Sequence, residues 1–130
     1  MAKMRWRESN RCRWVGIRPA HQGEQVSAFG LVSNGTQIIY TVPVGKTFYL
    51  CAWIHDVYMG AAGNGQLLVY TDGGVLTYRL GIGAGTVLGV THRLSGSCWP
   101  PMEFPAGYTV RLSSAAALVD SYGSIYGWVQ

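Results

Sequence analysis

Two stretches of similar sequence decide the fold: VPVGKTFYL runs from Val42 to Leu50, and FPAGYTVRL runs from Phe104 to Leu112. Both begin with an apolar residue, proline, a small residue and glycine, and both place threonine and leucine at the same later positions. Proline fixes φ at the second position of a turn and glycine suits the fourth, so each copy predicts a turn that leads directly into a strand. We interpret the copies as equivalent corners of two Greek-key halves; the alternative is two hairpins with the same turn chemistry by chance.

The chain around these copies alternates between short β-rich runs and turns. The 18 glycines and the lack of lysine- and glutamate-rich runs favour short strands over helices. Asn64-Gly65 and Asp72-Gly73-Gly74 predict tight turns, and we expect a turn or bulge at 81–85 and a break at 95–97. The expected strands are 36–42, 46–58, 66–71, 75–82, 86–94, 108–114 and 123–130. The sequence therefore predicts an all-β fold, a jelly-roll-like antiparallel β-sandwich of about eight strands with an extended N-terminal arm.

Charge divides the chain into an arm, residues 1–25, and a sandwich domain, residues 26–130. The arm holds six cations against two carboxylates, whereas the domain holds four of each. Tryptophan and arginine are typical anchors of protein interfaces, and such an arm can also extend a neighbour's sheet. Contact with nucleic acid and a solvated tail are the alternatives. The predicted partner-binding residues are Arg5, Trp6, Arg7, Arg11, Arg13 and Trp14.

A second predicted contact surface comes from comparing the two copies. Alternation after FPAG turns Thr109, Arg111 and Ser113 outward, which suits water. Alternation after VPVG turns outward a set too apolar for comfortable solvation, and such patches mark contact surfaces. The alternative is that this strand is central and covered on both faces by its own chain. The predicted subunit interface is Tyr49, Cys51 and Trp53.

Little in the sequence indicates catalysis, and we expect no enzymatic activity, no cofactor and no metal site. His55 and Asp56 are adjacent, so on a strand they point to opposite faces. The stretch GIGAGT at 81–86 lacks the third glycine and the following helix of a dinucleotide loop. The three cysteines have no CxxC spacing, which favours buried thiols, with an inter-chain bridge through Cys12 as the alternative. No apolar run is long enough to predict a membrane span.

The stretches IIYTVPVGKTFYL, PPMEFPAGYTVRL and SIYGWV, within residues 36–130, resemble small β-sandwich virion proteins of tailed bacteriophages. That family comprises head-decoration (cement), appendage and tail-associated proteins with jelly-roll or tumour-necrosis-factor-like folds. The resemblance implies a homotrimer on a particle, with arms that reach the major capsid protein or other virion proteins. It carries over no catalytic residue.

We therefore expect a non-enzymatic virion structural protein that is assembled in the host cytoplasm. Only 12% of its residues are charged, against about a quarter in ordinary soluble domains, which also favours burial between subunits. The alternative is a lectin-like module for host adhesion, in which Trp99 or Trp128 lines a shallow sugar-binding groove. A role in binding nucleic acid through the arm is a third hypothesis.

Overall fold

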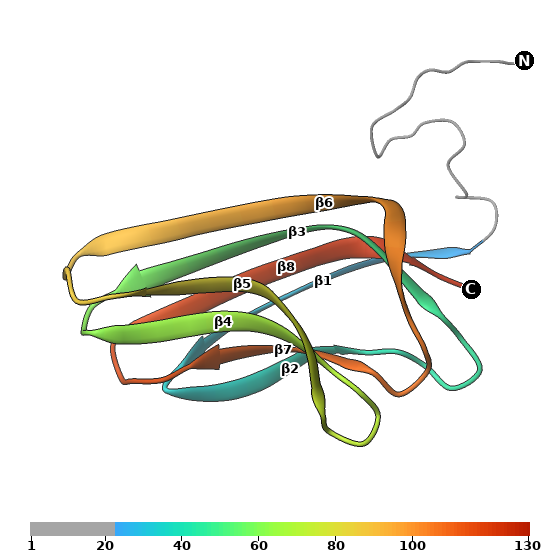
Figure 1. The fold of residues 1–130 in the computed structure, drawn as a ribbon, viewed down its shortest axis with the longest axis horizontal. Coiled ribbons are helices and arrows are strands. Elements are labelled where there is room, and N and C mark those ends of the chain that lie inside the picture. Colours follow the sequence, from blue (N-terminus) through green and yellow to red (C-terminus); the bar gives the residue numbers. More distant parts are fainter. Residues whose placement is uncertain (1–22) are drawn as a thin grey trace, which may run out of the picture.

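The computed structural model, which describes residues 23–130, contains eight strands in two antiparallel sheets (Figure 1). The described residues form no helix, so the all-β prediction is confirmed. The strands are β1 (Glu24–Ser33), β2 (Gly35–Thr41), β3 (Phe48–Met59), β4 (Gly63–Tyr70), β5 (Leu76–Gly85), β6 (Val90–Phe104), β7 (Thr109–Ser114) and β8 (Val119–Val129). β1 begins two residues before the expected start of the domain at residue 26.

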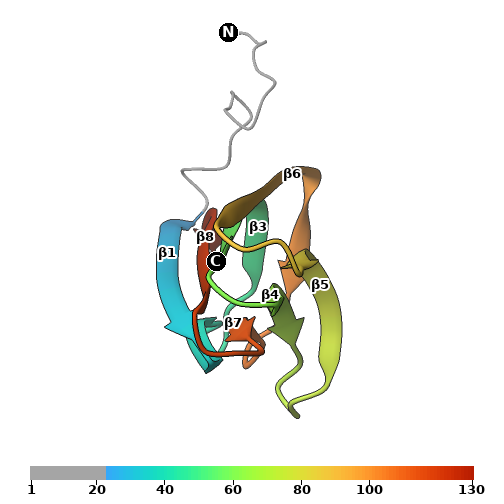
Figure 2. The same cartoon turned by 90° about the vertical axis from the view of Figure 1, so that its left-hand side faces the viewer.

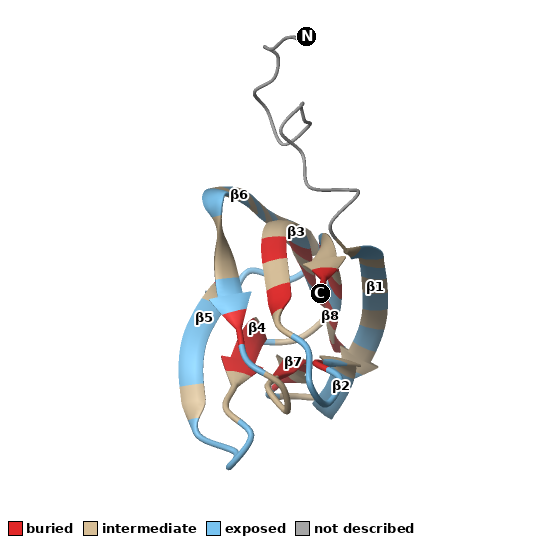
Figure 3. Ribbon diagram, turned by 90° about the vertical axis from the view of Figure 1, so that its right-hand side faces the viewer, coloured by how far each residue is buried: buried red, intermediate tan, exposed pale blue. Residues whose placement is uncertain are grey.

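The two sheets face each other as the layers of a sandwich, which Figure 2 shows end on. One sheet has the strand order β1-β8-β3-β6, and the other has the order β2-β7-β4-β5. This interleaving of eight strands is the jelly-roll arrangement that the sequence predicts. The central strands β3, β8, β4 and β7 carry most of the buried positions, whereas the edge strands are largely exposed (Figure 3).

The two sequence copies form adjacent corners that cross between the sheets. The first copy joins β2 to β3 and the second joins β6 to β7, so neither copy is a hairpin within one sheet. The Val42 N–H donates to the carbonyl of Tyr108, and the Val42 carbonyl accepts from the N–H of Gly107, both at 2.9 Å. The chance-hairpin alternative is therefore wrong, and the corners support each other through backbone hydrogen bonds.

The frame of each turn differs from the prediction by one residue. In the first copy the Lys46 N–H donates to the Pro43 carbonyl at 3.1 Å, which makes proline the first turn residue. Glycine is then the third residue, and Gly45 and Gly107 have φ of 76° and 87°. A type II turn requires a positive φ at its third residue, a conformation that glycine adopts without a Cβ penalty. The position of each turn is therefore determined by the positive φ of its glycine and not by the fixed φ of its proline.

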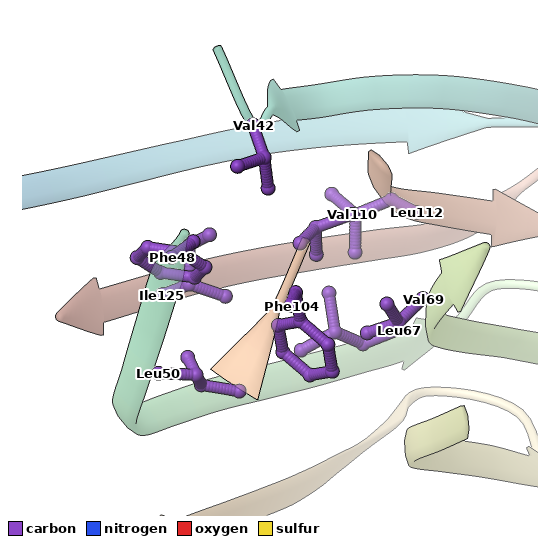
Figure 4. Close-up of a cluster of buried hydrophobic side chains, with 9 residues drawn as sticks. All are labelled: Val42, Phe48, Leu50, Leu67, Val69, Phe104, Val110, Leu112 and Ile125. Carbon is purple, nitrogen blue, oxygen red and sulfur yellow. The ribbon is translucent and has the colours of Figure 1, made fainter. Parts of the chain in front are cut away.

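The same two copies supply most of the main hydrophobic core. Each contributes the residue before its proline and two inward residues of the following strand. Six of the nine buried residues in the cluster come from the copies, and three come from β4 and β8 (Figure 4). The cluster consists of Val42, Phe48, Leu50, Phe104, Val110 and Leu112 from the copies, with Leu67, Val69 and Ile125. The repetition thus reflects packing: both corners bring equivalent residues into one core.

Two local predictions are wrong, and a third is confirmed in one of its two forms. Asn64 and Gly65 lie inside β4, where they pair with Ala84 and Gly83 of β5, and residues 95–97 lie within the 15-residue strand β6. The glycine-rich range 81–85 is the end of β5 rather than a turn, but a bulge lies beside Gly81, because Leu67 pairs with Gly81 and Leu68 with Arg79. A Cβ on Gly65 would meet Ser121 and Val57, so glycine there leaves room for the facing sheet.

Candidate protein interface

A β-bulge at Cys51 reverses the expected orientation of β3. Leu50 pairs with Gly127 of β8, and Ala52 pairs with the next residue back, Tyr126, so Cys51 is an extra residue in the ladder. Such a bulge moves every later side chain to the other face of the sheet. The predicted interface residues Tyr49 and Trp53 therefore lie on opposite faces of the sheet, because one lies before the bulge and the other after it.

Trp53 is the clearest correction that follows from this bulge. Its side chain packs against the main core cluster rather than facing outward. The indole lies against Gly96 of β6, where a Cβ would collide with the ring. Tyr49, before the bulge, does lie on the outer side, between the buried residues Phe48 and Leu50. Cys51 is half-buried at the bulge itself.

The outer side of the sheet β1-β8-β3-β6 nevertheless carries an exposed apolar surface. Strand register places its members on one face: Leu31 pairs with Tyr122, which pairs in turn with Asp56. Phe29, on the edge strand β1, is 80% exposed, and the other five members are 39–51% exposed. We call this surface the aromatic face; it consists of Phe29, Leu31, Ile54, Tyr58, Tyr122 and Tyr126.

All six side chains therefore reach solvent in the single chain. They come from β1, β3 and β8, three neighbouring strands of one sheet. A group of apolar side chains on one face of a small domain marks a contact surface.

Two further aromatic residues extend the aromatic face at one end. The rings of Tyr49 and Trp128 are stacked, with their centroids 5.1 Å apart and their planes 10° from parallel. The two residues are paired across β3 and β8, next to the end of the sheet where the described chain begins. Gly23 lies there too, because a Cβ on it would meet the Trp128 side chain. The arm therefore joins the domain beside this stack.

Charge on this sheet is predominantly negative. Its four strands contain Glu24, Asp56, Glu103 and Asp120, against Arg93 alone. Arg93 donates to both carboxylate oxygens of Asp56, at 2.8 and 2.9 Å. The hydrogen bond from Arg93 holds the pKa of Asp56 below its usual value, so this carboxylate stays charged.

The outer side of the other sheet, β2-β7-β4-β5, differs in character. Its strands contain Arg79 and Arg111 and no carboxylate. The Arg111 guanidinium lies 4.2 Å from the centre of the Tyr70 ring and donates to the Thr109 hydroxyl at 2.9 Å. Arg111 and Ser113 are half-exposed, whereas Thr109 is buried, which corrects its expected exposure. The central position of β7 and the bond from Arg111 explain this burial.

A histidine lies between the sheets as a second result of the bulge. His55 is fully buried, and its Nε2 lies 2.9 Å from the hydroxyl of Ser121, which is also fully buried. Burial lowers the pKa of His55 to about 4, and the nearby charge of Asp56 only partly opposes this. Because the Ser121 hydroxyl is buried, this pair presents no accessible nucleophile. Asp56 points to the other face, as the sequence predicts.

The remaining predicted residues have different outcomes. Trp99 is 60% exposed on the edge strand β6, whereas Trp128 is half-buried in its stack with Tyr49. Cys98 is half-buried in β6. The predicted arm residues and Cys12 lie outside the described residues, so their part in binding stays a prediction. No sequence pattern indicated the aromatic face, because neither the bulge at Cys51 nor the exposed side of β1 follows from local spacing along the chain.

Within residues 23–130 there is no group of three or more acidic, histidine or cysteine side chains arranged to hold a metal ion. None of the described chain forms a helix that is both long and apolar enough to span a membrane. Neither a scan against protein-family models nor a search of curated proteins finds a match for this chain.

Proposed function

We propose that this protein is a non-enzymatic structural component of a tailed-phage particle, a capsid decoration (cement) protein or a related head or tail component. It forms a homo-oligomer, with a trimer as the favoured state, through the aromatic face. Its N-terminal arm docks onto neighbouring subunits of the particle. The assignment to a phage particle rests on the sequence resemblance, and the oligomer rests on the aromatic face.

The single observation that supports a structural role is the contrast between the two outer faces. One outer face exposes Phe29, Leu31 and Tyr122 on adjacent strands. On the opposite sheet the exposed apolar residues Ile38 and Ile82 lie apart, on the two edge strands β2 and β5. The same sheet carries polar contacts, such as the hydrogen bond that Arg79 donates to Gln66 at 3.1 Å. Burial of apolar surface is the main favourable term in association, so the aromatic face is where contact with another subunit stabilises most.

Incorporation into particles tests this function. Leu31→Asp and Ile38→Asp form a matched pair, because both residues are 51% exposed on edge strands but belong to different sheets. Particles purified on a density gradient should contain the wild-type chain at a fixed ratio to the major capsid protein. Leu31→Asp should lower that ratio and Ile38→Asp should not. A wild-type chain that stays outside the particle fraction would contradict the proposal.

A sugar-binding module for host adhesion is the second candidate, and the exposure of Trp99 favours it. An exposed indole ring offers a flat apolar surface on which a sugar ring can stack. This candidate predicts glycan-array binding by the wild-type chain that Trp99→Ala abolishes. Binding that survives this substitution, or no binding across a broad array, would exclude Trp99 as a sugar-stacking residue.

A further inference from the structure

The arm and the sheet that bears the aromatic face have opposite charge. Residues 1–22 hold six cations against one carboxylate, a net charge of +5. The outer side of the sheet β1-β8-β3-β6 carries Asp56, Glu103 and Asp120 against Arg93, a net charge of −2, because Glu24 pairs with the inward-facing Val129. Two copies that met aromatic face to aromatic face would bring these like charges together, which opposes association. The arm is the part of the chain whose charge complements this sheet.

We propose that residues 1–22 of one copy bind across the aromatic face of a neighbouring copy. This inference rests on the proposed function, because it names the neighbour that receives the arm as a second copy of this chain. An arm that covered its own face would leave no contact to hold the copies together. Exchange of arms between copies joins the two contact regions, the arm and the aromatic face, into one interface.

The length of the arm allows this exchange. An extended chain spans about 3.3–3.6 Å per residue, so 22 residues reach roughly 70–80 Å. A sheet of four strands is about 15–20 Å wide, since neighbouring strands lie about 4.8 Å apart. The arm joins the domain at Gly23, beside the Tyr49–Trp128 stack at the end of the sheet. Residues 1–22 are therefore long enough to extend from one copy and cross the whole aromatic face of the next.

The chemistry of the two regions also matches. The arm interleaves four arginines with two tryptophans, and the aromatic face presents tyrosine rings beside carboxylates. An arginine over a tyrosine ring gains a cation–π attraction, and a nearby carboxylate adds a charged hydrogen bond. The same fold already uses the first contact, between Arg111 and Tyr70. On the aromatic face, Tyr58 is paired with Asp120, which places a ring next to a carboxylate.

Complementation between two defective full-length chains tests the proposal. The arm variant replaces the four arginines by glutamine and both tryptophans by alanine; the face variant is Leu31→Asp. Native mass spectrometry, with one chain labelled by ¹⁵N, should show an oligomer for the wild type and a 14.1-kDa monomer for each variant alone. An equimolar mixture should form a heterodimer, because it combines one intact arm with one intact face. The arm variant carries these substitutions: Arg5→Gln, Trp6→Ala, Arg7→Gln, Arg11→Gln, Arg13→Gln and Trp14→Ala.

Salt and the remaining outcomes separate this inference from the proposed function. Raising the ionic strength from about 0.1 M to 1 M shortens the screening length from about 10 Å to 3 Å, so the heterodimer should weaken. If the arm variant stays oligomeric, or if the mixture stays monomeric beside an oligomeric wild type, arm exchange is wrong and the proposed function stands. If the wild-type chain is itself a monomer, both are wrong.

Discussion

Acid should destabilise this protein through one buried imidazole. His55 is neutral in the folded chain because burial lowers its pKa to about 4, whereas in the unfolded chain its pKa is near 6.5. The unfolded state therefore binds a proton first as the pH falls. The contribution of neutral His55 to the free energy of unfolding is fully present above about pH 6.5, and it is lost progressively as the pH falls to about 4.

The expected loss is large enough to measure. Each unit of difference between the folded and unfolded pKa values changes the free energy of unfolding by about 1.4 kcal/mol. The difference for His55 therefore corresponds to a loss of about 3 kcal/mol. Small domains have a free energy of unfolding of about 5–15 kcal/mol, so this loss is a substantial fraction. Ser121 is the only hydrogen-bond partner of the imidazole among the described residues, and it bonds through Nε2.

Urea unfolding at pH 7, 5.5 and 4, followed by tryptophan fluorescence, measures this loss. The matched control is His55→Gln, which keeps an amide near Ser121 but cannot take up a proton. The difference between the two chains isolates His55, because all other titrating groups are common to both. An equal loss of stability in the variant, or an NMR titration of the His55 ring near pH 6.5, would refute the reasoning.

Four substitutions test packing and backbone strain by the same unfolding measurement. Leu112→Ala should cost about 2–5 kcal/mol, because this leucine is fully buried in the main core; a loss below about 1 kcal/mol would contradict that packing. Gly81→Ala should cost about 1–3 kcal/mol, since its Cβ would lie 2.6 Å from Nδ1 of His55. Gly73→Ala, whose Cβ would lie 3.9 Å from its nearest neighbour, the Thr71 hydroxyl, should change stability little. Leu118→Gly should stabilise by about 1 kcal/mol because it relieves a positive φ of 68°, and a loss would count against that strain.

The sequence predicted the architecture because repeated corners leave a direct trace in it. Proline and glycine mark each turn, and the apolar residues around them, such as Val42 and Phe104, fall in the core. The asymmetry between the two copies also pointed to the sheet on which the aromatic face lies. These features depend on local spacing along the chain, which a single sequence contains.

The orientation of β3 and the place of Asn64-Gly65 could not be predicted, because they depend on contacts between residues far apart in the sequence. The bulge at Cys51 follows from the packing of β3 between two neighbours, and no residue type in its vicinity requires it. Without it, Trp53 and His55 would face outward. Asn64-Gly65 has the composition of a hairpin, but the facing sheet leaves no room for a Cβ at Gly65. Tertiary packing therefore overrides both local patterns.

The molar mass of the full-length chain in solution tests the central claim most directly. Light scattering over a range of concentrations should give a multiple of 14.1 kDa for the wild type and for Ile38→Asp, with a trimer as the favoured state. Leu31→Asp should give 14.1 kDa while keeping the β-sheet circular dichroism of the wild type. A monomeric wild type, or a Leu31→Asp variant that associates as strongly as Ile38→Asp, would contradict the aromatic face as the subunit interface.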